Sequence, residues 1–286
     1  MYAVSTPGWA WVAGRVMPLD DASVPLDDPG FLLGDGVFET LRARRGRIFE
    51  WPRHRARMAD GLDVLGIEPG TLDGAKAALE ALADAAASTF DDQYLRVQVV
   101  REAGPAEPAG GRVTALVRPL PVYPAHWYGT GVHLGVAEWC SDPQSPIAGV
   151  KSLSYLPQVL ARRRAQARGL DDALVLNTEG RVCESAHGNV IARLGHTLYA
   201  PGREEGGLAG VTRDVLLCWA EDNGYAVEIR LPWDVLAEAE EAVLVSTLAG
   251  VVPVASVEGL NSRFAGGNGE LAVALAQAYE ELLNNG

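Results

Sequence analysis

Alternating apolar and polar positions predict several strands in the first 120 residues of the chain. Residues 94–100 alternate like a half-buried strand, and residues 113–117 can pair with them across the Gly- and Pro-rich turn between the two runs. Residues 31–42 contain a Gly-Asp-Gly turn that opens into another alternating run, as expected where a sheet edge meets a loop. Short strand-like runs also occur in residues 9–16. The pattern therefore predicts a small sheet.

Two helices are predicted beside this sheet. Residues 52–65 show helical spacing, and residues 71–87 form an Ala-rich run that Thr71 could cap, with Asp73 in its first turn. Prolines then interrupt the chain from position 119 to 124, where neither a helix nor a central strand continues easily. A domain boundary is expected there.

The rest of the chain mixes short strands with helices. The predicted strands are residues 132–136, 173–176, 189–193, 197–199, 226–229 and 242–246. The predicted helices are residues 154–168, 212–222, 233–239 and 270–283. No internal repeat is present, and the glycines near position 267 indicate a surface turn. We expect an α+β fold with a small domain over residues 1–120, a linker over 121–130 and a larger domain over 131–286.

Charge and the N-terminal sequence argue against several classes of protein. The formal net charge is −13, which is unsuited to a surface that binds phosphate backbones or anionic lipid. No run of about 18 apolar residues occurs, and the first residues lack the basic start and apolar stretch of a secretory signal. We therefore expect a cytoplasmic protein with no nucleic acid partner and no membrane partner.

Cysteine spacing gives no sign of a metal site. Cys140, Cys183 and Cys218 are far apart and show neither Cys-x-x-Cys spacing nor clustering with the five histidines. We expect all three to be reduced core residues, and we expect no metal.

Lysine is rare in this sequence, which narrows any chemistry that needs an amine. Only Lys76 and Lys151 are lysines among the 24 basic residues. Lys151 follows an apolar Gly-Val pair, as suits an amine that must be partly desolvated to attack a carbonyl. Lys76 lies in the Ala-rich helix four residues before Glu80, where a solvated side chain is expected.

Three further segments combine polar groups with apolar surroundings. Glu184 follows a turn and a short apolar segment, where it could pair with a protonated ring nitrogen or simply lie at a strand end. A Gly-rich run leads into a helix at Thr212, which could bind a phosphate or be an ordinary helix start. Ser246 and Thr247 end an apolar strand, where they could reach an anion or only favour the strand.

These segments resemble, in order and spacing, those of the class-IV (fold type IV) pyridoxal phosphate enzymes. The Gly-Asp-Gly-Val-Phe-Glu run that ends at Glu39 and the His-Arg-Ala-Arg-Met run that starts at His54 complete the resemblance, which covers nearly the whole chain. It implies a small α/β domain and a larger β-rich domain with flanking helices. The family includes branched-chain and D-amino acid aminotransferases, R-selective amine transaminases and aminodeoxychorismate lyases.

The resemblance also implies pyridoxal 5′-phosphate as cofactor and assigns residues to it. Lys151 matches the Schiff-base lysine, which also moves the proton. The matching cofactor-binding residues are Arg57, Lys151, Tyr155, Glu184, Val211, Thr212 and Thr247. Among these, Glu184 matches the carboxylate on the pyridine nitrogen and Arg57 the arginine on the phosphate. The family is typically dimeric, so a homodimer is expected.

Different segments of the chain resemble subfamilies with different substrates. Residues 94–96 match a Tyr-Ile-Arg segment of branched-chain aminotransferases, although Arg96 could equally face solvent. The Arg-x-His carboxylate trap of D-amino acid aminotransferases is absent from residues 101–108. Residues 246–254 instead resemble the corresponding segment of aminodeoxychorismate lyases. The candidate substrate-binding residues are Phe38, Tyr94, Arg96, Leu248 and Ala249.

The expected function is transfer of an amino group from a small or apolar amino acid, or an amine, to a 2-oxo acid. One alternative is aminodeoxychorismate lyase, which forms 4-aminobenzoate and pyruvate. Another is a protein that binds pyridoxal phosphate without turnover. The presence of both Lys151 and Glu184 argues against the last, because a carrier needs no electron sink.

Overall fold

The computed structural model describes residues 7–102, 108–261 and 263–285. Contacts divide the chain into two units. The first runs to Val122 and includes Val150–Ser154, and the second consists of Tyr123–Gly149 and Tyr155–Asn285. The units differ from the expected boundaries in two places. A short helix, α4 (Ala125–Gly129), occupies the expected linker, and Val150–Ser154 packs with the first unit.

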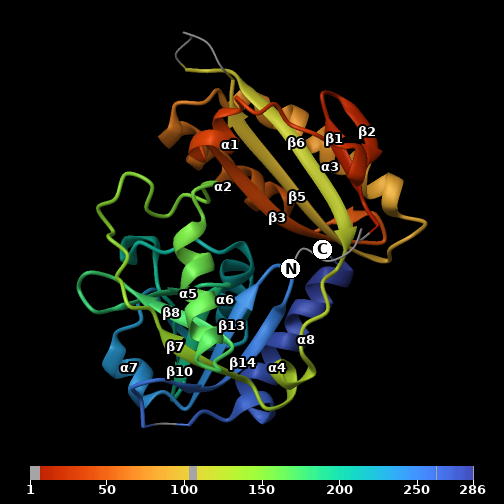
Figure 1. Ribbon diagram of the computed structural model, residues 1–286. Helices are drawn as coiled ribbons and strands as arrows, with labels where there is room; N and C mark the ends of the chain where they lie inside the picture. The colour runs from red at the N-terminus through yellow and green to blue at the C-terminus, as the bar shows by residue number, and fades with distance from the viewer. Residues whose placement is uncertain (1–6, 103–107, 262, 286) are drawn as a thin grey trace. The chain divides into compact units, whose positions relative to one another are not determined.

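The first unit contains a six-stranded antiparallel sheet (Figure 1). Its strands are β1 (Trp9–Val12), β2 (Arg15–Pro18), β3 (Gly36–Arg44), β4 (Arg47–Ile48), β5 (Asp92–Arg101) and β6 (Gly111–Pro119), in the order β2-β1-β6-β5-β3-β4. The predicted pairing of residues 94–100 with 113–117 is confirmed by the ladder of β5 with β6. The predicted strand that opens from the Gly-Asp-Gly turn of residues 31–42 is confirmed as β3, which pairs with β5 along its length. On its other side β4 pairs only with Ala43 and Arg44, beyond the predicted range.

The described part of this unit contains the α-helices α1 (Pro29–Leu33), α2 (Trp51–Leu65) and α3 (Leu72–Ala86). Apolar side chains of α2 and α3, among them Leu62 and Leu79, pack with the sheet in one core. Asp73 lies in the first turn of α3 as predicted, but Thr71 makes no side-chain cap. Thr71 ends a preceding 3-10 turn in helical conformation, whereas a capping residue usually adopts an extended one.

Successive side chains of a strand point to opposite faces, and this rule divides the sheet into two surfaces. Odd-numbered residues of the central strands, such as Leu41 and Val97, belong to the core with α2 and α3. Even-numbered residues therefore form the other face, where Phe38 is paired with Gln98 across the ladder. Phe38 and Glu39, although adjacent, point in opposite directions.

The second unit contains an eight-stranded mixed sheet (Figure 1). Its strands are β7 (Val132–Val136), β8 (Asp172–Leu176), β9 (Val182–Ser185), β10 (Asn189–Leu194), β11 (Thr197–Tyr199), β12 (Ala226–Glu228), β13 (Glu241–Ser246) and β14 (Gly250–Val257), in the order β12-β11-β10-β13-β14-β7-β8-β9. Strand β14 was not predicted from the sequence, because its proline, Pro253, disfavours a strand interior.

Longer helices flank this sheet: α5 (Leu156–Ala167), α6 (Val211–Asp222) and α8 (Glu270–Asn285), with the short α7 (Trp233–Glu238). One core of the unit joins apolar side chains of β7, β10, β13 and β14 to α4 and α7. Within the described part of the chain, no helix combines the length and apolarity needed to cross a membrane. The expected surface turn near position 267 is a 3-10 turn, Gly266–Asn268, whose Gly266 is buried against the Thr130 carbonyl.

The surface departs from the sequence expectations at two cysteines. Cys183 is buried as predicted, but Cys140 and Cys218 are exposed, so assigning all three to the core is wrong.

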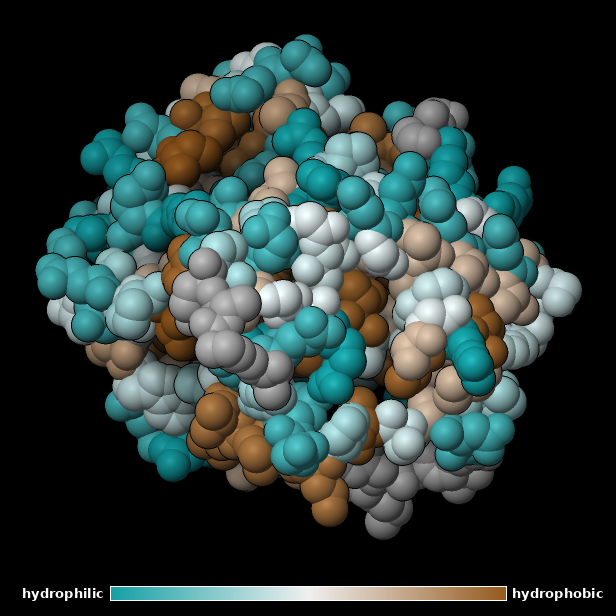
Figure 2. All heavy atoms as spheres, turned by 90° about the horizontal axis from the view of Figure 1, so that it is seen from above, coloured by the Kyte–Doolittle hydropathy of each residue, from teal (hydrophilic) through white to brown (hydrophobic). Residues whose placement is uncertain are grey.

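Figure 2 shows one face of the molecule, on which hydrophobic patches lie among hydrophilic residues. In the first unit, exposed large apolar side chains gather in and just before α1: Val24, Leu26, Phe31, Leu32 and Leu33.

Candidate active site

Lys151 lies on a short extended segment that runs alongside the first residues of β3. The Phe38 N–H donates to the Lys151 carbonyl at 2.9 Å, the Leu153 N–H donates to the Gly36 carbonyl at 2.9 Å, and Ser152 forms a bridge with Val37. These bonds fix the backbone of the lysine against the sheet. Lys76, in contrast, forms an exposed ion pair with Glu80 at 3.6 Å, as predicted.

The ring of Phe38 lies under two cationic side chains. The Lys151 ammonium is 4.7 Å from the ring centroid, and the Arg96 guanidinium is 3.8 Å from it. Arg96 also donates from Nε to Gln98 at 3.1 Å. Tyr94 precedes Arg96 by two positions on β5 and therefore points to the same face of the sheet. Arg96 thus lies against Phe38 instead of extending into solvent.

Glu39 points to the opposite face of the sheet, toward α2. Its carboxylate accepts two hydrogen bonds from Arg57, from Nε at 2.8 Å and from Nη2 at 2.7 Å. It also contacts Nδ1 of His54 at 2.8 Å. Because His54 and Arg57 are three residues apart on a helix, both reach the same carboxylate. This bidentate arrangement fixes the plane of the guanidinium.

The charges of this buried group follow from its contacts. Burial alone would raise the pKa of Glu39, but the Arg57 charge and the bonds from His54 and Arg57 outweigh it and hold that pKa well below its usual range. Burial lowers the pKa of His54; Glu39 acts to raise it, but burial together with the charges of Arg57 and Lys151 outweighs Glu39. His54 is therefore neutral. An ionised carboxylate cannot donate, so the shared proton lies on Nδ1 of His54.

Glu184, on β9, is held by groups from two other segments. Leu208 donates its backbone N–H to Oε2 at 3.0 Å, and Gln158 of α5 donates to Oε1 at 3.3 Å. The Leu208 carbonyl accepts from the Asn189 side chain at 2.8 Å. The Gly-rich run allows this packing, because a Cβ at Gly210 would lie 1.7 Å from Oδ1 of Asn189.

The N-terminus of α6 and the turn between β13 and β14 meet at two threonines. The hydroxyl oxygens of Thr212 and Thr247 are 3.4 Å apart. The cap residue of α6, Gly210, has no side chain with which to satisfy the first N–H groups of the helix, and Val211 begins the helix. Backbone donors, a helix dipole and hydroxyls therefore occur together, and this combination suits an anion.

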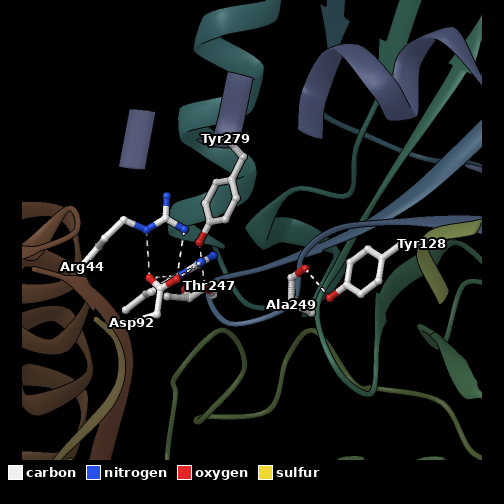
Figure 3. Close-up of polar contacts among 7 residues, drawn as sticks. Arg44, Asp92, Tyr128, Thr247, Ala249 and Tyr279 are labelled. Atoms are coloured by element: carbon white, nitrogen blue, oxygen red, sulfur yellow. Dashed lines mark hydrogen bonds and ion pairs between the residues drawn. The ribbon is translucent and has the colours of Figure 1, made fainter. Parts of the chain in front are cut away.

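The turn that contains Thr247, Leu248 and Ala249 is held from outside by two tyrosines. Tyr279 of α8 donates its hydroxyl to the Thr247 carbonyl at 2.5 Å, and Tyr128 of α4 donates to the Ala249 carbonyl at 3.0 Å (Figure 3). Both tyrosines were missed in the sequence, because these contacts span 32 and 121 positions and leave no local pattern.

The predicted site residues thus form groups inside each unit. In the first unit, Phe38, Arg96 and Lys151 come together, and Arg57 is joined to Glu39 and His54. In the second unit, the groups are Thr212 with Thr247 and Glu184 with the Leu208 loop. Tyr155 is the residue before α5, half-buried and one turn ahead of Gln158.

Two features of this arrangement escaped sequence reasoning. Glu39 and His54 carried no predicted role, although a carboxylate inside an apolar strand and a histidine three residues before an arginine were visible signals.

Residues 103–107, within the stretch where a carboxylate trap was judged absent, lie outside the described residues. Among the residues that the structure describes, no three His, Cys, Asp or Glu side chains are grouped so that they could hold a metal ion.

Known proteins resemble this chain along most of its length. An aminodeoxychorismate lyase of Vibrio harveyi is 30% identical over 257 residues, which cover 86% of this chain and 90% of the relative. A putative branched-chain-amino-acid aminotransferase of Methanocaldococcus jannaschii is 29% identical and covers 95% of each chain. The crystal structure of 4-amino-4-deoxychorismate lyase from Pseudomonas aeruginosa superposes with a TM-score of 0.80 at 30% identity, over 95% of this chain and 98% of that one.

The family described as amino-transferase class IV matches residues 36–257. This range begins at β3 and ends with β14, and it includes the groups around Lys151, Glu184 and Thr247. Enzymes of this family are pyridoxal phosphate-dependent transaminases and related lyases of fold type IV, in agreement with the two-sheet α+β architecture. The chain therefore belongs to the class-IV aminotransferase family.

Proposed function

We propose that this protein is a pyridoxal phosphate-dependent aminotransferase for small or apolar amino acids, or amines, with a 2-oxo acid as acceptor. The observation that carries the proposal is the pair of cations on the Phe38 ring. Arg96 offers a positive charge to a carboxylate close to the amine of Lys151, and Phe38 offers an apolar surface to a side chain. Amino acids and 2-oxo acids present this combination of groups.

The donor set of the chain suits pyridoxal phosphate. Lys151 supplies the amine that would hold the cofactor covalently, and its position over an aromatic ring reduces its solvation. The hydroxyls of Thr212 and Thr247 beside the start of α6 suit a phosphate. Arg57 would add a positive charge whose orientation Glu39 fixes. When bound, the cofactor supplies an electron sink that makes the proton on the substrate α-carbon acidic.

Two side chains of this proposal have distinct tasks. Lys151 acts as the general base that takes the proton from the substrate α-carbon and returns it at another atom. Glu184, held as an acceptor by the Leu208 N–H and by Gln158, would keep a ring nitrogen protonated. Because both bonds come from packed segments, the carboxylate is oriented before any ligand arrives.

Absorbance spectra test this function directly. The protein with pyridoxal phosphate is expected to show the visible band of a lysine-bound cofactor, and Lys151→Ala is expected to lose it. Lys76→Ala, which removes an exposed lysine, is the matched control and keeps the band. Amino donors from a panel of L- and D-amino acids and amines are expected to bleach the band. An unchanged band with every donor, together with no amino transfer to pyruvate or 2-oxoglutarate, would refute the aminotransferase.

Aminodeoxychorismate lyase is the alternative that a specific observation favours. The sequence from Ser246 to Val254 resembles that of the lyases, and two relatives at 30% identity carry that name. Formation of 4-aminobenzoate from aminodeoxychorismate, without bleaching of the cofactor band, would establish the lyase. A coloured protein inert to all of these substrates would instead indicate a protein that binds the cofactor without turnover.

A homodimer is part of the proposal. The exposed apolar side chains in and just before α1, among them Phe31, Leu32 and Leu33, give a surface that a second copy could cover. Light scattering after gel filtration measures the mass. A monomeric mass at micromolar concentration would overturn the proposed homodimer but would leave the proposed reaction unaffected.

A further inference from the structure

We propose that Tyr279 and Tyr128 are positioning residues that hold the turn after β13 so that the Leu248 N–H points at an anionic oxygen of the bound ligand. The inference rests on the proposed function, in which Thr247 lies beside the ligand. It concerns groups that touch the turn from the side of α8 and α4 and that need not touch the ligand themselves.

The peptide bond between Thr247 and Leu248 is planar. The Thr247 carbonyl and the Leu248 N–H belong to one trans peptide, so they point in opposite directions. Tyr279 binds the carbonyl oxygen at 2.5 Å. The Leu248 N–H must therefore point away from α8. Among the described residues it has no hydrogen-bond partner, and it remains available as a donor.

Ala249, the last residue of the turn, is held through both of its backbone polar groups. Tyr128 donates to the Ala249 carbonyl at 3.0 Å, and the Ala249 N–H donates to the Ser246 hydroxyl at 3.4 Å. Gly250 pairs with Ser246 in the ladder between β13 and β14. With the Thr247 and Ala249 carbonyls held, the peptide between Thr247 and Leu248 cannot flip without losing the bond to Tyr279 (Figure 3).

The sequence makes room for the Tyr279 ring. Gly250 has a positive φ of 67°, which suits glycine, and a Cβ there would lie 3.1 Å from two ring atoms of Tyr279. Any larger residue at position 250 would push the ring away. The glycine that closes the turn thus also allows the tyrosine to reach the carbonyl of Thr247.

Helix α8 is fixed relative to the turn by a second contact, at the other end of β13. Glu241, the first residue of β13, accepts the Leu271 N–H at 3.1 Å and binds Arg193 at 2.7 Å. Tyr279 lies eight positions after Leu271, roughly two helical turns further along. Helix α8 therefore contacts both ends of β13. Its N-terminus is hydrogen-bonded to the first residue of the strand, and Tyr279 is hydrogen-bonded to the turn after the strand.

Substitution of the hydroxyls tests the inference. Tyr279→Phe removes the bond and keeps the ring, and Tyr128→Phe does the same for Ala249. Tyr225→Phe, on a tyrosine stacked against His196, is the matched control. We expect Tyr279→Phe to weaken ligand binding about tenfold, as expected when one oriented hydrogen bond to an anion is lost. Tyr128→Phe is expected to have a smaller effect, and Tyr225→Phe none.

Three measurements separate the possible anions. A rise in the Kd for pyridoxal phosphate, titrated by absorbance, would assign the Leu248 N–H to the cofactor phosphate. A rise in KM for the amino acid with unchanged Kd and kcat would assign it to the substrate carboxylate. Unchanged Kd and KM, with only a lower free energy of unfolding in urea, would mean that the tyrosines are structural and would overturn the inference.

Inorganic phosphate keeps this test independent of the proposed function. Should the wild-type protein form no cofactor band with pyridoxal phosphate, the proposed function fails, and phosphate binding is measured by calorimetry in wild-type protein and Tyr279→Phe. Weaker phosphate binding by the variant supports the inference even then. Equal binding, or no binding by either protein, overturns it.

Discussion

Nδ1 of His54 lies 2.8 Å from Oε2 of Glu39, and both side chains are completely buried. His54 therefore serves as a hydrogen-bond donor to a carboxylate that also forms an ion pair with Arg57. Removal of the carboxylate should therefore affect the stability of the fold.

Replacement of Glu39 by Gln would leave the Arg57 charge without its partner in the interior. Breaking a buried ion pair by removing one partner costs about 3–5 kcal/mol, because the remaining charge is uncompensated. We expect a loss of this order in the free energy of unfolding, measured in urea. Because the pKa of Glu39 lies well below its usual range, the loss should be the same at pH 5 and pH 8.

Asp92→Asn provides the comparison for Glu39. Asp92 also binds two arginines, Arg42 and Arg44, but its side chain is about one-third exposed. Solvent screens such a pair, so the expected loss is clearly smaller than for Glu39→Gln. Equal losses in the two variants would show that burial of Glu39 does not determine its contribution.

Asp172 on β8 should make stability depend on pH. Burial raises its pKa to about 6 and outweighs the Arg162 charge, so the folded state prefers the protonated form. Ionisation of Asp172 therefore destabilises the fold as pH rises from the unfolded-state pKa, near 3.8, through the folded one. Asp172→Asn should raise the free energy of unfolding at pH 8, relative to wild type, by about 2 kcal/mol more than at pH 4.5.

The neighbouring Asp171 gives a control of opposite sign. Burial acts to raise its pKa, but the His133 N–H and the His126 and Trp127 side chains hold the pKa below its usual value. Its contribution to stability is present above the unfolded-state pKa and is lost in acid. Asp171→Asn should therefore destabilise at pH 8, and less so as the pH falls. Parallel pH profiles for the two variants would contradict both assignments.

Arg96 should distinguish carboxylate substrates from simple amines. A hydrogen-bonded charge contact contributes about 1.5–3 kcal/mol, which corresponds to roughly a 10- to 150-fold rise in KM when Arg96 is replaced by Leu. We expect this rise for amino acids and 2-oxo acids, and little change for primary amines without a carboxylate. Arg118→Leu, an exposed arginine on the same face of the sheet, is the control. A rise of equal size for amines would place Arg96 outside the carboxylate site.

Gly210 should tolerate no side chain. An alanine Cβ would overlap the Asn189 side chain, which holds the Leu208 carbonyl, and would displace the loop whose N–H binds Glu184. Overpacking of this kind costs about 1–3 kcal/mol in the free energy of unfolding. Cofactor affinity, measured by absorbance titration, should fall as well. Gly129→Ala, whose Cβ meets no neighbour, is the steric control and should leave the affinity unchanged.

Local patterns predicted the secondary structure well where a segment was long and periodic. Strand β7 has the expected bounds, and α2 and α6 begin within one residue of the expected position. The misses have physical causes. The cap at Thr71 failed because a 3-10 turn precedes the helix, and β14 was overlooked because a proline stands inside it. Neither fact follows from apolar spacing.

Some residues of the candidate site could be predicted from the sequence, and others could not. Lys151 could be singled out because only one other lysine exists and that one belongs to an exposed helix face. The role of Glu39 required knowing that β3 turns this side chain toward α2, which depends on sheet register. Tyr279 depended on a contact between a helix and a distant turn. The sequence therefore identified residues whose chemical type alone suggests a role, and it did not identify residues whose role depends on a tertiary contact.

The placement of Val150–Ser154 with the first unit has a consequence for gene recombination. Cutting the chain once, after Val122, would separate the sheet that carries Phe38 from the peptide that carries Lys151. A chimera between two relatives that exchanges only the first 122 residues would pair one parent's β3 with the other parent's lysine segment. Functional hybrids should therefore need three crossovers, so that this five-residue insert is inherited together with the strand it joins.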